Sequence, residues 1–151
     1  MTKDDLLATL RNAVLTHKKW VGNALALIEG VPLDKNKVPV NATECEFGKW
    51  YYSDGQKLKD LPGFKEIEKS HNRLHRTYME IFAILFGEAN ELSFFSKLIG
   101  RSHKIASANR QAAMDKYLLL EDHSNLIISQ LEQMEKMISA MGEKQTAKYL
   151  S

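Results

Sequence analysis

Three histidines and the single cysteine of this 151-residue chain stand where they could share a metal ion. His17 and His71 each occupy a place on an apolar helical stripe where a leucine or valine is expected. His75 follows His71 by one helical turn, so both imidazoles lie on adjoining parts of one face and can converge on one ion. A buried imidazole without a partner costs on the order of 1 to 3 kcal/mol. These rings therefore need partners, and a metal is one way to supply them.

Cys45 offers a fourth donor. A single cysteine cannot form an internal disulfide, so the thiol is a buried bystander, a reactive group or a metal ligand. The run Thr43-Glu44-Cys45-Glu46 matches a capping box, which predicts a short helix that begins there and carries Cys45 in its first turn. The helix dipole would favour the thiolate at that place. Glu44 and Glu46 oppose this effect, but a bound dication would outweigh them.

Three imidazoles and one thiolate make a closed tetrahedral set of borderline-soft ligands. Such a set suits Zn²⁺ better than Mg²⁺ or Ca²⁺, and Cu²⁺ is the alternative on affinity alone. Paired histidines four residues apart and lone cysteines are common without a metal, so neither feature alone predicts a site. The placement of the four donors on three separate predicted helices favours one. Spacing by itself supports a zinc site about as strongly as its absence.

The helices that must position these residues follow from apolar periodicity. Apolar residues recur at alternating spacings of three and four along three stretches, and no stretch alternates as a strand would. The stretches are 4–29, 64–85 and 113–141. A further short helix is expected over 88–101. We therefore predict an all-α fold, an antiparallel four-helix bundle with an additional short helix that carries Cys45.

Length and composition limit the domains and partners. A chain of 151 residues is expected to form a single domain, 1–151, with its motifs within about 5–90 and a long C-terminal helix over about 103–141. The 21 basic and 19 acidic residues are interspersed, which argues against nucleic acid as a partner. The N-terminal residues lack a secretory pattern and no apolar run is long enough for a membrane span, so we expect no membrane association and a cytoplasmic protein.

Three short motifs surround the candidate ligands. They are His17-Lys18-Lys19-Trp20, Cys45-Glu46-Phe47-Gly48-Lys49-Trp50 and His71-Asn72-Arg73-Leu74-His75. In order and content they resemble the chemoreceptor zinc-binding (CZB) domain family, in which a His followed by Trp, a Cys-x-Phe-Gly-x-Trp segment and a His-x-x-x-His helix carry the zinc ligands. The resemblance implies that His17, Cys45, His71 and His75 bind one zinc ion.

The resemblance also implies a function. Family members are zinc-responsive regulatory domains of bacterial signalling, attached to chemotaxis receptors or diguanylate cyclases and often dimeric. We therefore expect a sensor and not an enzyme, with a zinc cofactor, a homodimer and a chemoreceptor or diguanylate cyclase as partner. Since no output domain is visible in the chain, it is expected to act in trans or as a stand-alone sensor. Oxidation of Cys45 to a sulfenic acid would remove a ligand, so the site could report zinc level or oxidants such as hypochlorous acid.

Other functions compete with a sensor. In a structural interaction module, zinc would only staple the helices together. A zinc-dependent hydrolase needs water in the fourth coordination place, where this sequence offers Cys45, and it needs a carboxylate base that no motif provides. A hemerythrin-type iron site needs carboxylate bridges, and no His-x-x-x-Glu or His-x-x-x-Asp pair occurs. Around the site we expect Trp20 and Trp50 to exclude water and Gly48 to permit a close approach of the short helix.

Overall fold

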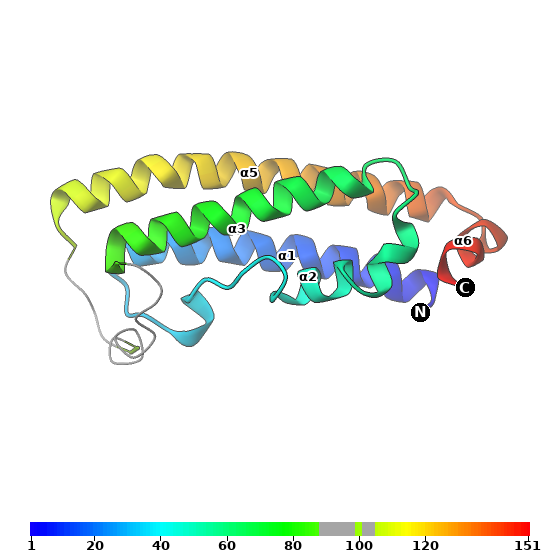
Figure 1. Cartoon of the computed structure of the whole chain (residues 1–151), viewed down its shortest axis with the longest axis horizontal. Coiled ribbons are helices and arrows are strands. Elements are labelled where there is room, and N and C mark those ends of the chain that lie inside the picture. Colours follow the sequence, from blue (N-terminus) through cyan, green and yellow to red (C-terminus); the bar gives the residue numbers. More distant parts are fainter. Residues whose placement is uncertain (88–98, 101–104) are drawn as a thin grey trace.

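Three long helices lie side by side along the molecule (Figure 1). They are α1 (Lys3–Ile28), α3 (Phe64–Phe86) and α5 (Ser107–Ala140). The computed structural model describes residues 1–87, 99–100 and 105–151. Within those residues the only β-structure is one isolated bridge, so the predicted all-α class is confirmed. None of the described helices has an apolar stretch long enough to cross a membrane.

The helices α1 and α3 run in the same direction, and α5 returns antiparallel to both (Figure 1). Ring contacts advance together along the first two, from His17 against His71 to Trp20 against Tyr78. The amino end of α1 instead meets the carboxyl end of α5, where a lysine side chain hydrogen-bonds its last carbonyls. An antiparallel order is thus confirmed for α5 against its neighbours only. The parallel pair arises because the connection over residues 29–63 brings the chain back to the end where α1 began.

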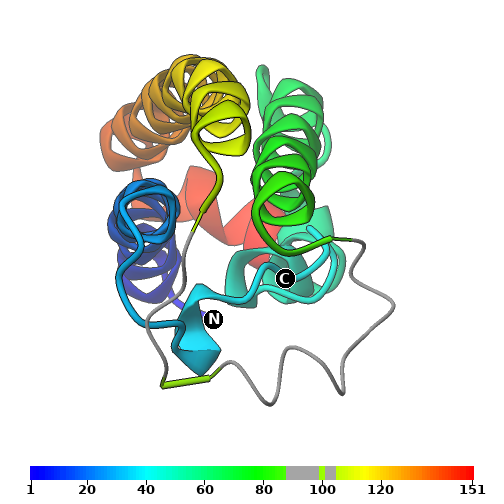
Figure 2. The ribbon, with the colours of Figure 1, turned by 90° about the vertical axis from the view of Figure 1, so that its left-hand side faces the viewer.

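That connection occupies the fourth side of the bundle (Figure 2). Glycines with positive φ mark its ends, Gly30 at 82° after α1 and Gly63 at 86° before α3, and only glycine adopts such angles without strain. It contains three short helices: η1 (Lys35–Lys37), α2 (Glu46–Tyr51) and η2 (Asp54–Leu58). The short helix α2 is thereby placed against α1 and α3, with its amino end facing the middle of the bundle.

The start of α2 differs from the prediction. Cys45 is itself the N-cap, and its Sγ accepts a hydrogen bond from the Gly48 backbone N–H at 3.2 Å. Thr43 lies in the turn before the helix, so the capping box expected there is wrong. A capping box occurs instead at the start of α1, where Thr2 and Asp5 bond reciprocally. Sulfur replaces the threonine hydroxyl as the cap because the chain turns so that Cys45, not Thr43, faces the first free N–H groups of α2.

Two further helices were expected toward the carboxyl end of the chain. The helix predicted over 88–101 lies outside the described residues except at 99 and 100. The last long helix begins at Ser107, later than the expected start near 103 because Ala106 has an extended backbone, and it ends at Ala140, close to the predicted end at 141. Beyond it the chain forms α6 (Glu143–Leu150), which the sequence pattern does not predict.

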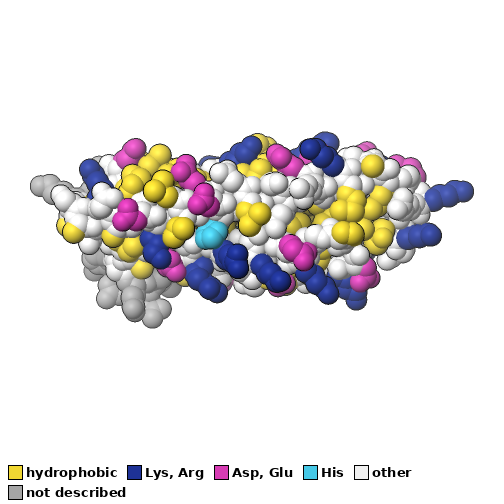
Figure 3. Space-filling view, turned by 90° about the horizontal axis from the view of Figure 1, so that it is seen from above, with side chains coloured by type: hydrophobic (Ala, Val, Ile, Leu, Met, Phe, Trp, Pro, Cys, Tyr) yellow, Lys and Arg dark blue, Asp and Glu magenta, His cyan; other side chains and the backbone are white. Residues whose placement is uncertain are grey.

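Buried apolar side chains form two clusters, one toward each end of the bundle. Along α1 the first cluster ends at Val14 and the second begins at Ala24, so the buried His17 falls between them. On α3 the first ends at Ile67 and the second begins at Leu74. The histidines thus form a polar layer inside an apolar core. The face seen from above in Figure 3 carries acidic and basic side chains interspersed with apolar areas.

Candidate metal centre

The structure brings together all four predicted ligand residues, which come from three elements. His17 lies on α1, Cys45 caps α2, and His71 and His75 lie on α3. One donor atom of each lies within 4.8 Å of every other, and Cys45 Sγ lies 3.3 Å from His71 Nε2. In a tetrahedral zinc site, bond lengths of about 2.0–2.1 Å to nitrogen and about 2.3 Å to sulfur place neighbouring donors about 3.3–3.6 Å apart. The cluster is therefore close to the size of a zinc coordination shell.

Two of the imidazoles are held in the tautomer that leaves Nε2 free to bind a metal. His17 Nδ1 lies 2.6 Å from the Ala13 carbonyl oxygen, and His75 Nδ1 lies 2.8 Å from the Val40 carbonyl oxygen. A carbonyl oxygen can only accept, so each Nδ1 carries the proton and donates it. Nε2 of both rings is then left with a free lone pair. Metal-binding histidines are commonly oriented by such a bond from their second nitrogen.

His75 Nε2 is buried and has no hydrogen-bond partner among the described residues. His75 as a whole residue is only 2% exposed. Leaving a buried acceptor unpaired costs about 1–3 kcal/mol. A metal ion at the centre of the cluster would satisfy this nitrogen, and the residues present therefore fit zinc.

Burial keeps the three imidazoles neutral. It lowers the pKa of His17 to about 4, with the nearby His75 acting in the same direction. Burial also lowers the pKa of His71 to about 2, and the neighbouring imidazoles of His75 and His17 add to the effect. The pKa of His75 is lowered as well, again mainly by burial. At neutral pH the rings therefore keep the lone pairs that a metal needs.

The thiol of Cys45 behaves differently from the prediction. Burial raises its pKa, and the charge of Glu46 adds to the rise, whereas N–H donors at the start of α2 act in the opposite direction. The helix terminus alone thus does not make Cys45 a thiolate, because desolvation outweighs it. A bound dication supplies the missing positive charge, and the sulfur then gives up its proton to solvent.

Gly48 permits the backbone geometry that places Cys45. A Cβ atom at this position would lie 1.7 Å from the Ala42 carbonyl oxygen, far inside any real contact. The predicted close approach therefore exists, although the neighbour is the turn that precedes α2 and not another helix. That turn folds over the first residues of α2 and sets the position of the sulfur, which also lies 3.5 Å from the Ala42 carbonyl oxygen.

Aromatic rings border the cluster as expected. The Trp20 ring lies 4.6 Å from the His75 ring, and Phe47 meets the His71 ring edge-on at 5.0 Å between centroids. Trp50 packs on Phe47 at 5.5 Å and so supports the site from further away. These rings shield most of the cluster from water.

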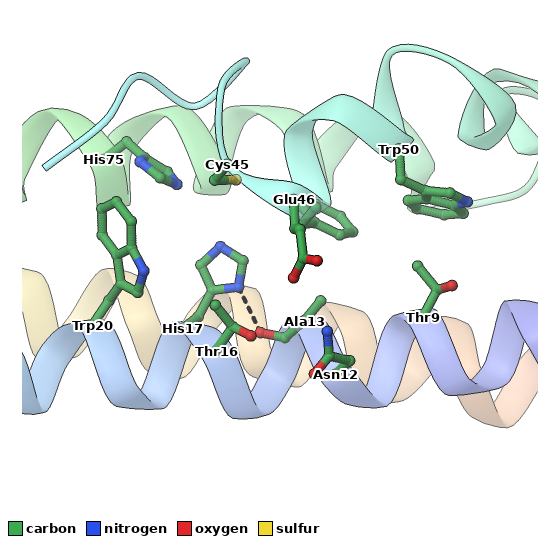
Figure 4. Close-up of a pocket in the computed structure, with 11 residues that line it drawn as sticks. Thr9, Asn12, Ala13, Thr16, His17, Trp20, Cys45, Glu46, Trp50 and His75 are labelled. Carbon is green, nitrogen blue, oxygen red and sulfur yellow. Dashed lines mark hydrogen bonds between the residues drawn. The ribbon is translucent and has the colours of Figure 1, made fainter. Parts of the chain in front are cut away.

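A pocket of about 200 Å³ reaches the cluster between α1 and α2 (Figure 4). Its lining includes His17, Cys45 and His75, whereas His71 is not part of it. Sequence reasoning missed Glu46 as a pocket residue, and Figure 4 shows its carboxylate pointing across the pocket toward α1. It also missed a small polar stripe on α1. The stripe residues are Thr9, Asn12 and Thr16, whose spacings of three and four were the available signal.

A helical bundle with a buried cluster of three histidines and one cysteine defines a metal-binding protein. Residues 17–82 match the model of one protein family, the chemoreceptor zinc-binding domain. The matched segment contains all four clustered side chains, so the resemblance drawn from the motifs is confirmed, and zinc is the metal that the family and the donor set indicate. The comparisons with curated proteins and with solved structures found no match.

Proposed function

We propose that this chain is a zinc-binding sensor or regulatory domain of bacterial signalling, in which His17, Cys45, His71 and His75 hold one Zn²⁺. One observation carries the proposal: four donor atoms of the right kind converge among buried side chains, within 4.8 Å of one another. Neutral imidazoles, two fixed tautomers and the unpaired His75 nitrogen support it. The family match gives the signalling context.

The output of the sensor would be a change in the position of α2. Bound zinc supplies a cross-link between α1, α2 and α3, to which α2 contributes only Cys45. Without that ligand, this six-residue helix is held by packing and by two hydrogen bonds to α3. The Tyr51 hydroxyl donates to the Phe64 carbonyl oxygen at 3.0 Å, and the hydroxyl of the cap residue Tyr52 donates to the Glu68 carboxylate at 2.9 Å. A helix this short has little stability of its own. Loss of the Cys45 ligand would therefore loosen α2 and change the surface that it forms.

Cys45 would also make the site sensitive to oxidants. Its side chain is 9% exposed and lines the pocket, so a small oxidant can reach the sulfur. Hypochlorous acid would oxidise the thiolate sulfur by two electrons. Its chlorine departs as chloride, and the sulfur gains a hydroxyl group to become a sulfenic acid. The product is a poor zinc ligand, so zinc affinity would fall.

The remaining features of the proposal concern context. We propose that residues 1–151 act as a single domain in the cytoplasm, as a homodimer, and in trans on a chemoreceptor or a diguanylate cyclase. The domain would bind and report, without catalysis of its own. The balanced charge on the outer face suits a protein partner better than nucleic acid.

A structural interaction module is the alternative that one observation favours. Closed sets of four nitrogen and sulfur ligands are typical of structural zinc sites. In that case zinc would exchange slowly and treatment with hypochlorous acid would leave it bound. The same closed set leaves no coordination place for the water that a hydrolase needs.

Native mass spectrometry of the purified protein tests the proposal. The wild-type chain should carry one zinc, whereas the Cys45→Ala and His71→Ala variants should lose it at limiting zinc while circular dichroism stays helical. His123→Ala is the matched control, since it removes an imidazole of α5 that is outside the cluster. Hypochlorous acid should release zinc from the wild type. Wild-type protein without zinc, or full zinc retention in both variants, would refute the assignment.

A further inference from the structure

The pocket beside the candidate metal centre connects the cluster with solvent. Asn12 and Glu46 are exposed at its mouth, Thr9 and Thr16 are half-buried, and the cluster residues at its base are buried. Its volume of about 200 Å³ far exceeds the roughly 10–15 Å³ that a single water needs, so a hydrated ion fits. The solvent exposure of the lining residues thus decreases from the mouth of the pocket to the metal-binding donors at its base.

Among the described residues that line the pocket, Glu46 has the one charged side chain. Glu46 is the acidic residue of the lining, and the other polar side chains there are neutral. Its carboxylate points from α2 across the pocket toward α1, next to the face where His17 lies (Figure 4). An exposed carboxylate attracts a dication from solution and can hold it through its water shell.

We propose that this pocket is the route by which the metal centre is loaded, and that Glu46 receives the hydrated ion before the buried donors bind it. This inference rests on the proposed zinc site and adds its access route. His17, Cys45 and His75 face the pocket and would bind first, while the Cys45 proton leaves to water in the pocket. His71 is absent from the lining, so it completes the shell last.

Matched substitutions separate this role from a general effect of charge. Glu46→Gln removes the carboxylate at nearly the same size. Glu44→Gln makes the same change two residues away, at a side chain that accepts a hydrogen bond from the Asn41 backbone N–H and does not line the pocket. Thr16→Phe narrows the pocket from α1. Leu15→Phe is its control, because Leu15 is 66% exposed and outside the lining.

The measurement is stopped-flow mixing of metal-free protein with zinc alone, followed by tryptophan fluorescence, together with the equilibrium zinc affinity from chelator competition. Glu46→Gln should slow association about five- to tenfold at low ionic strength, with less effect at 0.15 M salt. Thr16→Phe should slow association and dissociation by the same factor, several-fold, and leave the affinity unchanged. Both control variants should behave like the wild type.

The outcomes distinguish the route from the site. Association unchanged in Thr16→Phe, or equal slowing by Glu44→Gln and Glu46→Gln, would overturn the route. So would a Glu46→Gln variant that changes only dissociation, since the carboxylate would then stabilise the bound ion without receiving it. In each of these cases wild-type zinc binding stands. A wild-type chain that binds no zinc would instead defeat the proposed function.

Discussion

Substitution of Gly48 by alanine tests how the backbone places the thiol. The added Cβ would lie 1.7 Å from the Ala42 carbonyl oxygen, whereas ordinary contacts begin at 3.4 Å. The two atoms must therefore move apart by about a further 1.7 Å. The oxygen belongs to the backbone and the Cβ is fixed to it, so neither can rotate away. A shift of this size in the turn before α2 is half the 3.3 Å distance between Cys45 Sγ and His71 Nε2.

We expect Gly48→Ala to weaken zinc binding about 10- to 100-fold, the range typical for loss of support around a metal ligand. Overpacking should also lower the free energy of unfolding by about 1–3 kcal/mol. Chelator competition measures the affinity, and urea denaturation of the metal-free protein measures the stability. Both effects should appear while the long helices remain intact by circular dichroism.

Gly22→Ala is the matched control. Gly22 lies within α1, and a Cβ there would meet no atom within 4 Å. This change should leave zinc affinity unaltered and stabilise the helix by about 0.5–1 kcal/mol. The reasoning about the turn would be refuted if Gly48→Ala bound zinc within twofold of the wild type and unfolded at the same urea concentration.

Three further predictions concern pH, metal and the loop before α2. In metal-free protein, burial lowers the pKa of His17 from 6.5 to about 4, so the unfolded chain binds a proton at higher pH than the folded chain does. The free energy of unfolding should therefore fall as the pH drops below about 6.5, by about 2 kcal/mol between pH 7.5 and 5 from this residue alone. Urea titrations measure this, and a flat pH profile would contradict it. Free zinc at 100 times its dissociation constant should raise the unfolding free energy by about 2.7 kcal/mol, and His71→Ala should abolish that gain in calorimetry. Tyr78→Phe removes the hydrogen bond from the buried Tyr78 hydroxyl to the Lys37 carbonyl oxygen. It should lower the free energy of unfolding in urea by about 1–2 kcal/mol and change zinc affinity less than threefold. A larger loss of affinity would show that this bond positions the site.

The sequence predicted the long helices because their apolar spacing is repeated many times. It also indicated the polar layer, since a histidine in place of an apolar stripe residue, as at His17 or His71, stands out against that spacing. What it did not predict is decided by tertiary contacts. The parallel course of α1 and α3 depends on how residues 29–63 fold back, and that connection has no sustained period.

Local patterns were less reliable at the start of α2. Thr43 and Cys45 each stand three residues before a backbone N–H that their side chains could cap. The fold of the turn over Gly48 decides between them. The pKa of the Cys45 thiol likewise depends on burial, which the sequence does not reveal. The prediction that the start of α2 favours the thiolate therefore overestimated the pKa-lowering effect of the helix terminus. Glu46 was seen only as a charge near sulfur, because its place in the pocket depends on the packing of α2 against α1.

The central claim is that donors from α1, α2 and α3 share one ion, and zinc K-edge X-ray absorption of the zinc-loaded protein tests it most directly. Three nitrogen donors at about 2.0–2.1 Å and one sulfur at about 2.3 Å are predicted, with the sulfur contribution lost in Cys45→Ala. A wild-type spectrum without sulfur, or a shell of oxygen donors only, would contradict the account.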